Sequence, residues 1–450
     1  MTNQVAGAWG CCGSYYTEFT FNKYCRRFYA SEAILKKSVL NRLRLFMSII
    51  PKFGIKVLQL VYGALEKVLE RFNPPIRNLV VSLNPDGPVR GHVLLSYRIE
   101  LFLQRAGQPV PTYHPSWVIT ERMARKFLDF GYTVDVIANE NKSFLPKKEY
   151  TFFIDTRMNF ERLAPMLNKD CVKILHATTA HPYFHNAAEA KRLMALQERK
   201  HVTVRSRRFM PVRDAVAVEY ADCLTVPSEF CLQTFGYANK PFYLVPYPAE
   251  FVYPWAEAKN FESCRSRFLW LGSAGMVHKG LDLVLEAFAG MPEYHLTVCG
   301  PVAKEEDFER VYEQELYHTS NIHTLGWIDI DSPEFVNLAL QCVGFVYPSC
   351  SEGSAGAVIT CLHAGLIPII SRESGVDVSK EVNAVLEDCS IEAIQDAVRQ
   401  LASCSTSELE RKSRNAWEFA RANHTVENFE KQYGIMLEKI MMDFQMGKNT

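Results

Sequence analysis

The sequence lacks an excess of charge of either sign, because its 450 residues contain 50 Lys and Arg against 50 Asp and Glu. A chain without net positive charge does not have the usual electrostatic signature of a dedicated nucleic-acid-binding protein. The sequence also lacks the low hydrophobicity of disordered chains, since 48% of its residues are hydrophobic and 12% are aromatic. We therefore expect a globular protein that binds no nucleic acid, and the length predicts about two to three domains.

The 13 cysteines include no CxxC pair and no Cys/His cluster at zinc-finger spacing. Their number is odd and they are scattered along the chain, so we expect reduced and mostly buried thiols rather than disulfide bonds. The first 20 residues lack a basic start followed by an apolar run, and a secretory signal peptide is therefore not expected. These absences predict a cytoplasmic protein.

Residues 1–76 form an N-terminal extension whose charge departs from the balanced total. Residues 23–56 contain nine Lys or Arg and a single acid, Glu32. Apolar side chains of residues 39–50 recur at helical spacing, which predicts a basic amphipathic helix, and no uncharged run of 18 residues suggests a membrane span. Two interpretations stay open. In the first, residues 23–69 bind the anionic cytoplasmic face of a membrane. In the second, the helix packs on the enzyme body or on a partner.

After the extension, short apolar runs alternate with helical patterns, which is typical of an α/β fold. In the first half we expect strands at residues 92–97, 132–138, 151–155, 172–176 and 223–226, and helices at 116–130 and about 186–200. A Pro- and aromatic-rich connection at 237–265 precedes a second half with the same alternation. There we expect strands at 267–271, 295–299 and 343–347, and late helices at about 407–422 and 425–441. The pattern predicts two Rossmann-like halves.

Ligands of open α/β sheets bind outside the carboxyl ends of the strands, so the residues that follow the predicted strands are the candidates for a site. The run PSCSEGSAG (348–356) places Gly353, Ser354 and Gly356 just before an apolar helix, where free backbone N–H groups favour an anion. Lys279, at the start of another helix, adds a positive charge to the same cleft. Taken alone, the Gly/Ser run is more simply explained as a turn, and Lys279 as a solvated surface lysine. Together they predict a diphosphate pocket.

Three segments have a more specific pattern: LGSAGMVHKGLDLVLEAF (271–288), NIHTLGWI (321–328) and VYPSCSEGSAGAVITCLHAGLIPII (346–370). In order, spacing and strand context they resemble the donor half of retaining, family 4-like glycosyltransferases of the glycosyl-transferase group 1 family. The resemblance covers residues from about 265 to 441, is looser in the first half and is absent from the extension. It implies a GT-B fold, in which two Rossmann-like domains face each other across a cleft. We expect the extension at 1–76, an acceptor domain at 77–247, a donor domain at 248–425 and a returning C-terminal helix at 426–450.

The resemblance implies a glycosyltransferase that moves a sugar, with retention, from a nucleotide-diphosphate sugar to a glycan, lipid or small-molecule acceptor. The nucleotide-sugar is a substrate, and neither a cofactor nor a metal is expected. Glu352 matches a family glutamate beside the donor sugar, and Lys279 matches a lysine on the diphosphate. The donor contacts that the resemblance implies are Gly272, Ser273, Gly275, His278, Gly300, Trp327, Ile328, Gly353, Ser354, Ala355, Gly356 and Thr360.

Family members often place a histidine of the first half near the sugar. The run HATTAHPYFH offers His176, His181 and His185, of which His181 is the first choice and His176 the second, although a structural histidine is the plainer interpretation of each. A basic cluster at residues 205–208 follows. We expect it to be a solvated loop rather than a contact to an anionic acceptor.

Two positions depart from the family pattern. Thr360 stands where the second glutamate is expected, and Ser273 stands where an arginine usually joins Lys279 on the diphosphate. Losing one such donor costs an enzyme about 3 to 4 kcal/mol unless something replaces it. The nearby candidates are the amides of Ala274 and Gly275, or His278. If nothing replaces it, the alternative is a nucleotide-sugar or glycan binding module; an epimerase or a glycan phosphorylase on the same fold is a third reading.

Overall fold

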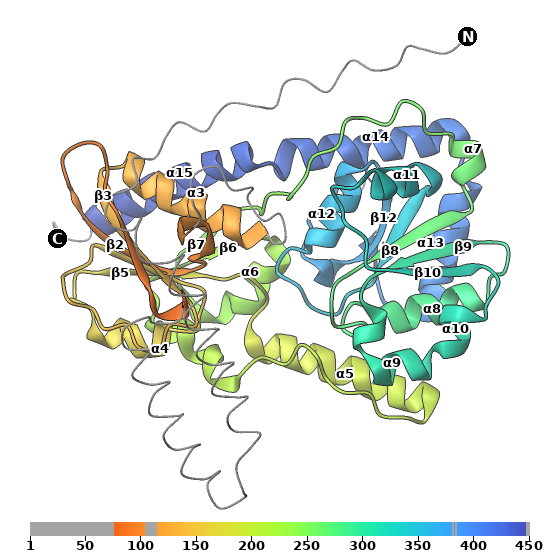
Figure 1. Cartoon of the computed structure of the whole chain (residues 1–450), viewed down its shortest axis with the longest axis horizontal. Coiled ribbons are helices and arrows are strands. Elements are labelled where there is room, and N and C mark those ends of the chain that lie inside the picture. The colour runs from red at the N-terminus through yellow and green to blue at the C-terminus, as the bar shows by residue number, and fades with distance from the viewer. Residues whose placement is uncertain (1–75, 104–114, 380–381, 383–384, 447–450) are drawn as a thin grey trace, which may run out of the picture. The chain divides into compact units, whose positions relative to one another are not determined.

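The computed structural model describes residues 76–103, 115–379, 382 and 385–446 (Figure 1). The predicted helix of residues 39–50 and most of the extension lie outside the described residues. Among the described helices, none combines the length and the low polarity that crossing a membrane requires. The ten described cysteines are all unpaired thiols, and eight of them are buried.

The first half forms a seven-stranded sheet with the order β1-β3-β2-β4-β5-β6-β7. Its strands are β1 (Val80–Leu83), β2 (Gly91–Tyr97), β3 (Tyr132–Ala138), β4 (Phe152–Asp155), β5 (Val172–His176), β6 (Cys223–Val226) and β7 (Phe242–Leu244). β1 pairs antiparallel with β3, and the remaining pairs are parallel. Every residue of β3 is buried, as expected for a strand whose sheet is covered on both faces.

The second half forms a six-stranded parallel sheet with the order β10-β9-β8-β11-β12-β13. Its strands are β8 (Arg267–Leu271), β9 (His295–Cys299), β10 (Ile322–Gly326), β11 (Gly344–Tyr347), β12 (Ile367–Ser371) and β13 (Val385–Leu386). From β8 the chain first adds β9 and β10 on one side, and then returns to add β11, β12 and β13 on the other. The strand order therefore reverses between β8 and β11, which is where open α/β sheets form a ligand crevice.

Helices connect the strands of both sheets (Figure 1). They are α3 (Pro115–Asp129), α4 (Phe160–Leu163), α5 (Pro182–Lys200), α6 (Glu229–Phe235), α7 (Phe261–Cys264), α8 (Leu281–Ala289), α9 (Glu306–Val311), α10 (Glu313–Tyr317), α11 (Pro333–Gln341), α12 (Gly356–His363), α13 (Ile391–Ser403), α14 (Thr406–Asn423) and α15 (Val426–Met446).

The last helix of the chain, α15, packs on the first-sheet half. The ring of Tyr433 contacts that of Phe127 on α3, with centroids 6.3 Å apart. Arg122 Nη1 donates to Glu430 Oε1 at 2.8 Å, and the Tyr243 hydroxyl on β7 donates to Asp443 Oδ2 at 2.8 Å. The chain thus returns to its first half after completing the second sheet.

The α/β class with two predominantly parallel sheets confirms the fold expected from the sequence. The bounds of β3, β5, β6, β8 and β9 coincide with the expected strands. α5 begins about four residues earlier than expected, because His181 caps the helix and Pro182 occupies its first position. β1 and β7 were not expected: β1 is a half-exposed edge strand, and β7 is three residues long within the Pro-rich connection.

Candidate active site

The loops after β8 and β11 bring a lysine and a glutamate together at the predicted crevice. Lys279 Nζ lies 2.6 Å from Glu352 Oε1 and 2.8 Å from the Tyr347 hydroxyl, which in turn donates to Glu352 Oε1 at 3.1 Å. The side chains of Lys279 and Glu352 are 7% and 12% exposed. Because an ammonium group has three N–H donors, this geometry leaves one for a ligand.

Glu352 is an ionised carboxylate at neutral pH. Burial acts to raise the pKa of Glu352, but the positive charges of Lys279 and Arg208 outweigh it and hold that pKa well below its usual range. The pair of Lys279 and Glu352 is consequently a buried ion pair with no net charge. An anion that enters beside it meets a preformed cation and a neighbouring negative charge.

The β11 loop leads into the N-terminus of α12. The amides of Glu352 and Ala355 donate to the carbonyls of Glu373 and Ser374, at 2.8 and 2.9 Å, which fixes the loop against the turn after β12. Ser354 Oγ is buried and has no hydrogen-bond partner among the described residues. α12 begins at Gly356 without a side-chain cap. This end of the loop can accept an anionic or hydroxyl-bearing ligand.

Backbone hydrogen bonds join the ends of β8, β9 and β10, where the next three loops begin. The Gly272 amide donates to the Cys299 carbonyl at 2.9 Å, and the Gly300 amide donates to the Gly326 carbonyl at 2.8 Å. The next residue, Trp327, is 64% exposed, while Ile328 is half-buried. Of the two positions that depart from the family pattern, Ser273 is exposed and Thr360 is buried within α12. The predicted donor contacts therefore gather at one end of the second sheet.

The first half meets this loop at Gly353. A Cβ atom at residue 353 would lie 2.3 Å from the Thr178 carbonyl oxygen, so only glycine permits this approach of two backbones. Ser228 Oγ, at the start of α6, donates to the Gly353 carbonyl at 2.6 Å. The loop after β5 and the turn before α6 thus close over the residue next to Glu352.

His176 and His181 form hydrogen bonds within the first half. His176 Nδ1 lies 2.7 Å from Thr225 Oγ1 and its Nε2 lies 3.0 Å from the Tyr247 hydroxyl; burial lowers the pKa of His176 to about 4. His181 Nδ1 accepts the Tyr183 amide at 3.2 Å as the cap of α5, and burial lowers its pKa. Neither ring hydrogen-bonds to Lys279 or Glu352. Their predicted role near the sugar stays a prediction.

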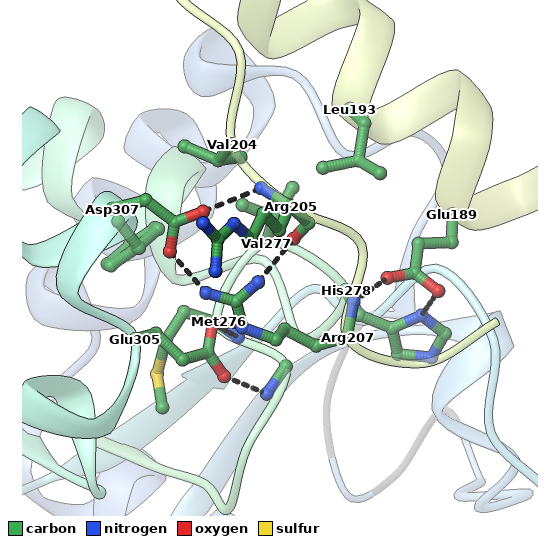
Figure 2. Close-up of a pocket in the computed structure, with 12 residues that line it drawn as sticks. Glu189, Leu193, Val204, Arg205, Arg207, Met276, Val277, His278, Glu305 and Asp307 are labelled. Atoms are coloured by element: carbon green, nitrogen blue, oxygen red, sulfur yellow. Dashed lines mark hydrogen bonds and ion pairs between the residues drawn. The ribbon is translucent and has the colours of Figure 1, made fainter. Parts of the chain in front are cut away.

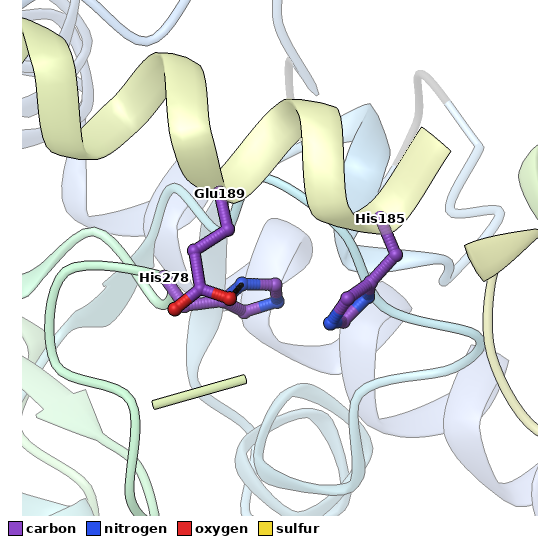
Figure 3. A group of neighbouring side chains, drawn as sticks. All are labelled: His185, Glu189 and His278. Atoms are coloured by element: carbon purple, nitrogen blue, oxygen red, sulfur yellow. Dashed lines mark ion pairs between the residues drawn. The ribbon is translucent and has the colours of Figure 1, made fainter. Parts of the chain in front are cut away.

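The third histidine of the run, His185, connects the two halves. Together with Glu189 on α5 and with His278 it forms a buried group whose ligand-type atoms all lie within 4.8 Å of one another (Figure 3). His185 Nε2 donates to the Arg208 carbonyl at 2.9 Å, and its Nδ1 accepts from Ser351 Oγ at 3.1 Å. Two imidazoles and a carboxylate are also ligands that could hold a divalent transition metal such as Zn²⁺.

His278 is similarly committed. Its Nε2 donates to the Ser351 carbonyl at 2.6 Å, which leaves Nδ1 as an acceptor 3.5 Å from Cys350 Sγ and 3.8 Å from Glu189 Oε2. Burial lowers the pKa of His278 to about 3, so its ring is neutral. A neutral ring with its N–H used by a carbonyl has no donor left for a phosphate.

The basic cluster after α5 is only in part the solvated loop that the sequence suggests. Arg207 is three-quarters buried and its guanidinium pairs with Asp307, with Glu305 3.9 Å away (Figure 2). The Arg205 amide donates to the other oxygen of Asp307 at 2.7 Å, while the Arg205 side chain is exposed. The expectation was wrong for Arg207, because Asp307 is distant in sequence and gave no local signal.

Sequence reasoning missed Tyr347 and Glu189, treated Arg208 only as a member of the basic cluster at 205–208, and ranked His185 below two other histidines. A partial signal existed, since His185 and Glu189 are four residues apart and thus share one face of a helix. That face was not recognised because α5 was expected to begin after His185.

Residues 265–404 match the model of a family described as glycosyl transferases group 1. No curated protein sequence matches the chain. Sucrose-phosphate synthase from Thermosynechococcus elongatus is similar in structure, with a TM-score of 0.56 and 14% identity, over 79% of this chain and 100% of that one. Anabaena HepE in complex with UDP has a TM-score of 0.51 and 11% identity, over 77% and 99%.

S. aureus TarM, in a complex that contains UDP, aligns with a TM-score of 0.45 and 11% identity over 63% of this chain, which spans only 54% of TarM. The family match covers the whole second sheet and both loops of the crevice. Residues 265–404 are thus similar to the glycosyl transferases group 1 family, and the two sheet-bearing halves form a GT-B fold.

Proposed function

We propose that the protein is a glycosyltransferase that moves a sugar from a nucleotide-diphosphate sugar to an acceptor. The proposal rests above all on the buried pair of Lys279 and Glu352, which lies at the strand-order reversal of a glycosyl transferases group 1 domain. The UDP bound to HepE, a protein of the same fold, is consistent with a nucleoside diphosphate as the leaving group.

The proposed chemistry follows from where charge develops. As the bond between the sugar and the diphosphate breaks, negative charge grows on the diphosphate and positive charge grows on the sugar. The free N–H of Lys279 and the backbone at the N-terminus of α12 would stabilise the diphosphate, and the Glu352 carboxylate would stabilise the sugar. Fixed charges of this kind act in the transition state without needing to reorganise.

We further propose retention at the anomeric carbon, as the resemblance to retaining enzymes implies. ¹H NMR of a freshly formed product measures the anomeric configuration before it equilibrates. A product with the configuration of the donor is expected, and the opposite configuration would reject retention while leaving transfer itself established.

We also propose that transfer needs no bound metal, because Lys279 and the backbone amides supply positive charge at the diphosphate. Dialysis against EDTA should leave the rate of transfer unchanged. If activity falls and added Zn²⁺ restores it, this part of the proposal fails, and the group of His185, Glu189 and His278 becomes the first metal site to test by Glu189→Gln.

Thermal unfolding with UDP, GDP, ADP, CMP and dTDP tests the donor site. A ligand at about 100 times its dissociation constant adds about 2.7 kcal/mol to the free energy of unfolding. One nucleotide should raise the unfolding midpoint of the wild type, and the rise should shrink in Lys279→Ala. If no nucleotide raises the midpoint, the proposed donor site is wrong.

A binding module is the second candidate function, favoured specifically by the uncharged Ser273 and by Thr360 at the positions that depart from the family pattern. Turnover separates the two candidates. A transferase releases nucleotide from the matching nucleotide-sugar, whereas a binding module holds the intact donor. Release by the wild type that is absent in Glu352→Gln supports transfer; tight binding without release supports the module.

A further inference from the structure

The three arginines that follow α5 differ in what neutralises them. Arg207 pairs with Asp307 (Figure 2), whereas Arg205 is exposed. Arg208 is also an exposed residue, and within the described part of the chain its guanidinium makes no hydrogen bond and no ion pair. Arg208 is thus an available cation, unlike its neighbour in sequence.

The backbone of Arg208 is held from both sides by buried residues of α5. Its amide donates to Glu189 Oε1 at 3.1 Å, and its carbonyl accepts from His185 Nε2 at 2.9 Å. Glu189 and His185 are 2% and 1% exposed, and both lie on the face of α5 drawn in Figure 3. The position of Arg208 is therefore fixed by contacts that do not involve its side chain.

The side chain of Arg208 lies across the loop after β8. A Cβ atom at Gly275 would lie 2.8 Å from Arg208 Cγ and 3.0 Å from Cδ, so the arginine stem occupies the space that the missing side chain of residue 275 leaves. Gly275 has a φ of 99°, in the region that favours glycine, and it precedes Lys279 by four residues. The stem of Arg208 therefore packs against the loop that carries Lys279.

The charge of Arg208 reaches the Lys279–Glu352 pair. Burial raises the pKa of Tyr347 and acts to raise that of Glu352, and the charge of Arg208 opposes it at both groups. At Glu352, only the charge of Lys279 has a larger opposing effect. Arg208 thus lies close enough to share an electrostatic environment with the pair while remaining exposed.

A charge balance shows why a further cation is needed. The two phosphates of a nucleotide-sugar carry two negative charges, but Lys279 is already compensated by Glu352, and Ser273 is uncharged. The Gly275 amide is used by the Glu305 carboxylate, and the N–H of His278 is used by the Ser351 carbonyl. Two of the candidates that the sequence suggested as replacements are therefore committed elsewhere.

We propose that Arg208 binds the diphosphate of the donor from the first-sheet side of the crevice, opposite Lys279. The inference rests on the proposed function and names a binding residue within that site. A guanidinium presents a planar fork of N–H donors that fits a phosphate through two hydrogen bonds. Donor binding then draws on both halves of the protein, with α5 as the element that positions the second cation.

Isothermal titration calorimetry tests the inference with UDP, GDP, ADP and dTDP, each compared with its nucleoside. The variants are Arg208→Ala, Arg208→Gln, Arg208→Lys and the matched control Arg205→Ala, which removes one exposed charge from the same loop. We expect Arg208→Ala and Arg208→Gln to lower the affinity for the preferred nucleoside diphosphate at least tenfold. The affinity for the nucleoside should change less than twofold. Arg208→Lys should recover part of the loss, and Arg205→Ala should change either affinity less than twofold.

The outcomes separate the inference from the function on which it rests. If the wild type binds none of the four diphosphates, the proposed function fails and the inference fails with it. If the wild type binds one and both neutral Arg208 variants bind it equally well, only the inference is overturned. Equal weakening of diphosphate and nucleoside would indicate a general distortion of the loop, and would also overturn it. Thermal unfolding without ligand confirms that each variant is folded.

Discussion

The two sides of the crevice are built in different ways. On the second-sheet side, Lys279 and Glu352 lie in the loops that directly follow β8 and β11, as the strand-end rule predicts. On the first-sheet side, the strand-end histidine His176 bonds inside its own half, whereas Ser228, which follows β6, donates to the Gly353 carbonyl of the second half. Two further contacts come from α5 and the loop beyond it: His185 bonds to Ser351, and the charge of Arg208 acts on Glu352. The strand-end rule thus identifies the second-sheet side of this site, whereas the first-sheet side combines strand-end loops with the long helix α5.

The helix α5 explains the difference, because its contacts extend well beyond its own half. Arg199 Nη2 donates to the buried Asp282 on α8 at 2.6 Å, and Arg192 Nη2 donates to the Pro348 carbonyl at 3.0 Å. Lys200 at the end of α5 pairs with Glu315 at 2.7 Å. His185 and Arg192 thus hold α5 against the loop after β11, while Arg199 and Lys200 fix its C-terminal end to α8 and α10.

The largest expected effect comes from removing a charge on the second-sheet side. Glu352→Gln keeps the shape of the side chain but removes the charge, and nucleotide release from the donor should fall about 10²- to 10³-fold, the usual cost of losing one preorganised electrostatic contact. Lys279→Ala should be equally inactive, and less stable by about 3 to 5 kcal/mol because it leaves Glu352 charged and buried. Initial rates measure the first effect, and chemical denaturation measures the second.

The control for both variants is Lys431→Ala, which removes an exposed lysine from α15. Its rate should match the wild type. If Glu352→Gln retains wild-type activity, Glu352 is not required for transfer. The proposal that the second-sheet side carries the catalytic charges is then wrong.

A smaller effect is expected where the two sides touch. In Gly353→Ala the new Cβ meets the Thr178 carbonyl, so the loops must separate, and overpacking of this kind costs about 1 to 3 kcal/mol. We expect a lower unfolding midpoint together with weaker donor binding. Gly236→Ala is the control, because nothing lies within 4 Å of a Cβ there and its φ is negative. Unchanged donor binding in Gly353→Ala would show that the contact is not part of the site.

The smallest effect concerns the strand-end histidine of the first sheet. The pKa of His176 in the folded protein is about 4, below the unfolded value of about 6.5, so between these values the unfolded state binds more protons and stability falls as the pH falls. His363 and His424, also with pKa values lowered to about 4 by burial, act in the same direction. Chemical denaturation at pH 7, 6, 5 and 4 measures how the free energy of unfolding changes with pH.

Each histidine of this kind contributes up to about 1.4 kcal/mol per pH unit to that slope. His176→Gln should therefore reduce the slope by up to this amount and leave the shape of the remaining curve unchanged. A slope identical to that of the wild type would mean that burial does not lower the pKa of His176.

The sequence allowed the fold to be predicted well where the signal is local. Apolar runs located the central strands, and the run before α12 indicated a candidate anion-binding turn, because these features depend on residues close together in the chain. Glu352 was assigned from the resemblance to the family pattern. The pairing of Arg207 with Asp307 and the approach of Arg208 to Gly275 depend on residues 67 to 100 positions apart, for which a single sequence has no local pattern. The first-sheet wall therefore became visible only in the folded chain.

The most direct test of the account is a crystal structure of the protein with a bound nucleoside diphosphate, chosen as the one that raises the unfolding midpoint most. We expect the diphosphate to lie beside Lys279, near the N-terminus of α12, with the Arg208 guanidinium within hydrogen-bond distance of a phosphate oxygen. A nucleotide bound away from the β8 and β11 loops would contradict the proposed function. A diphosphate held by the second-sheet side alone would contradict the claim that both halves bind it.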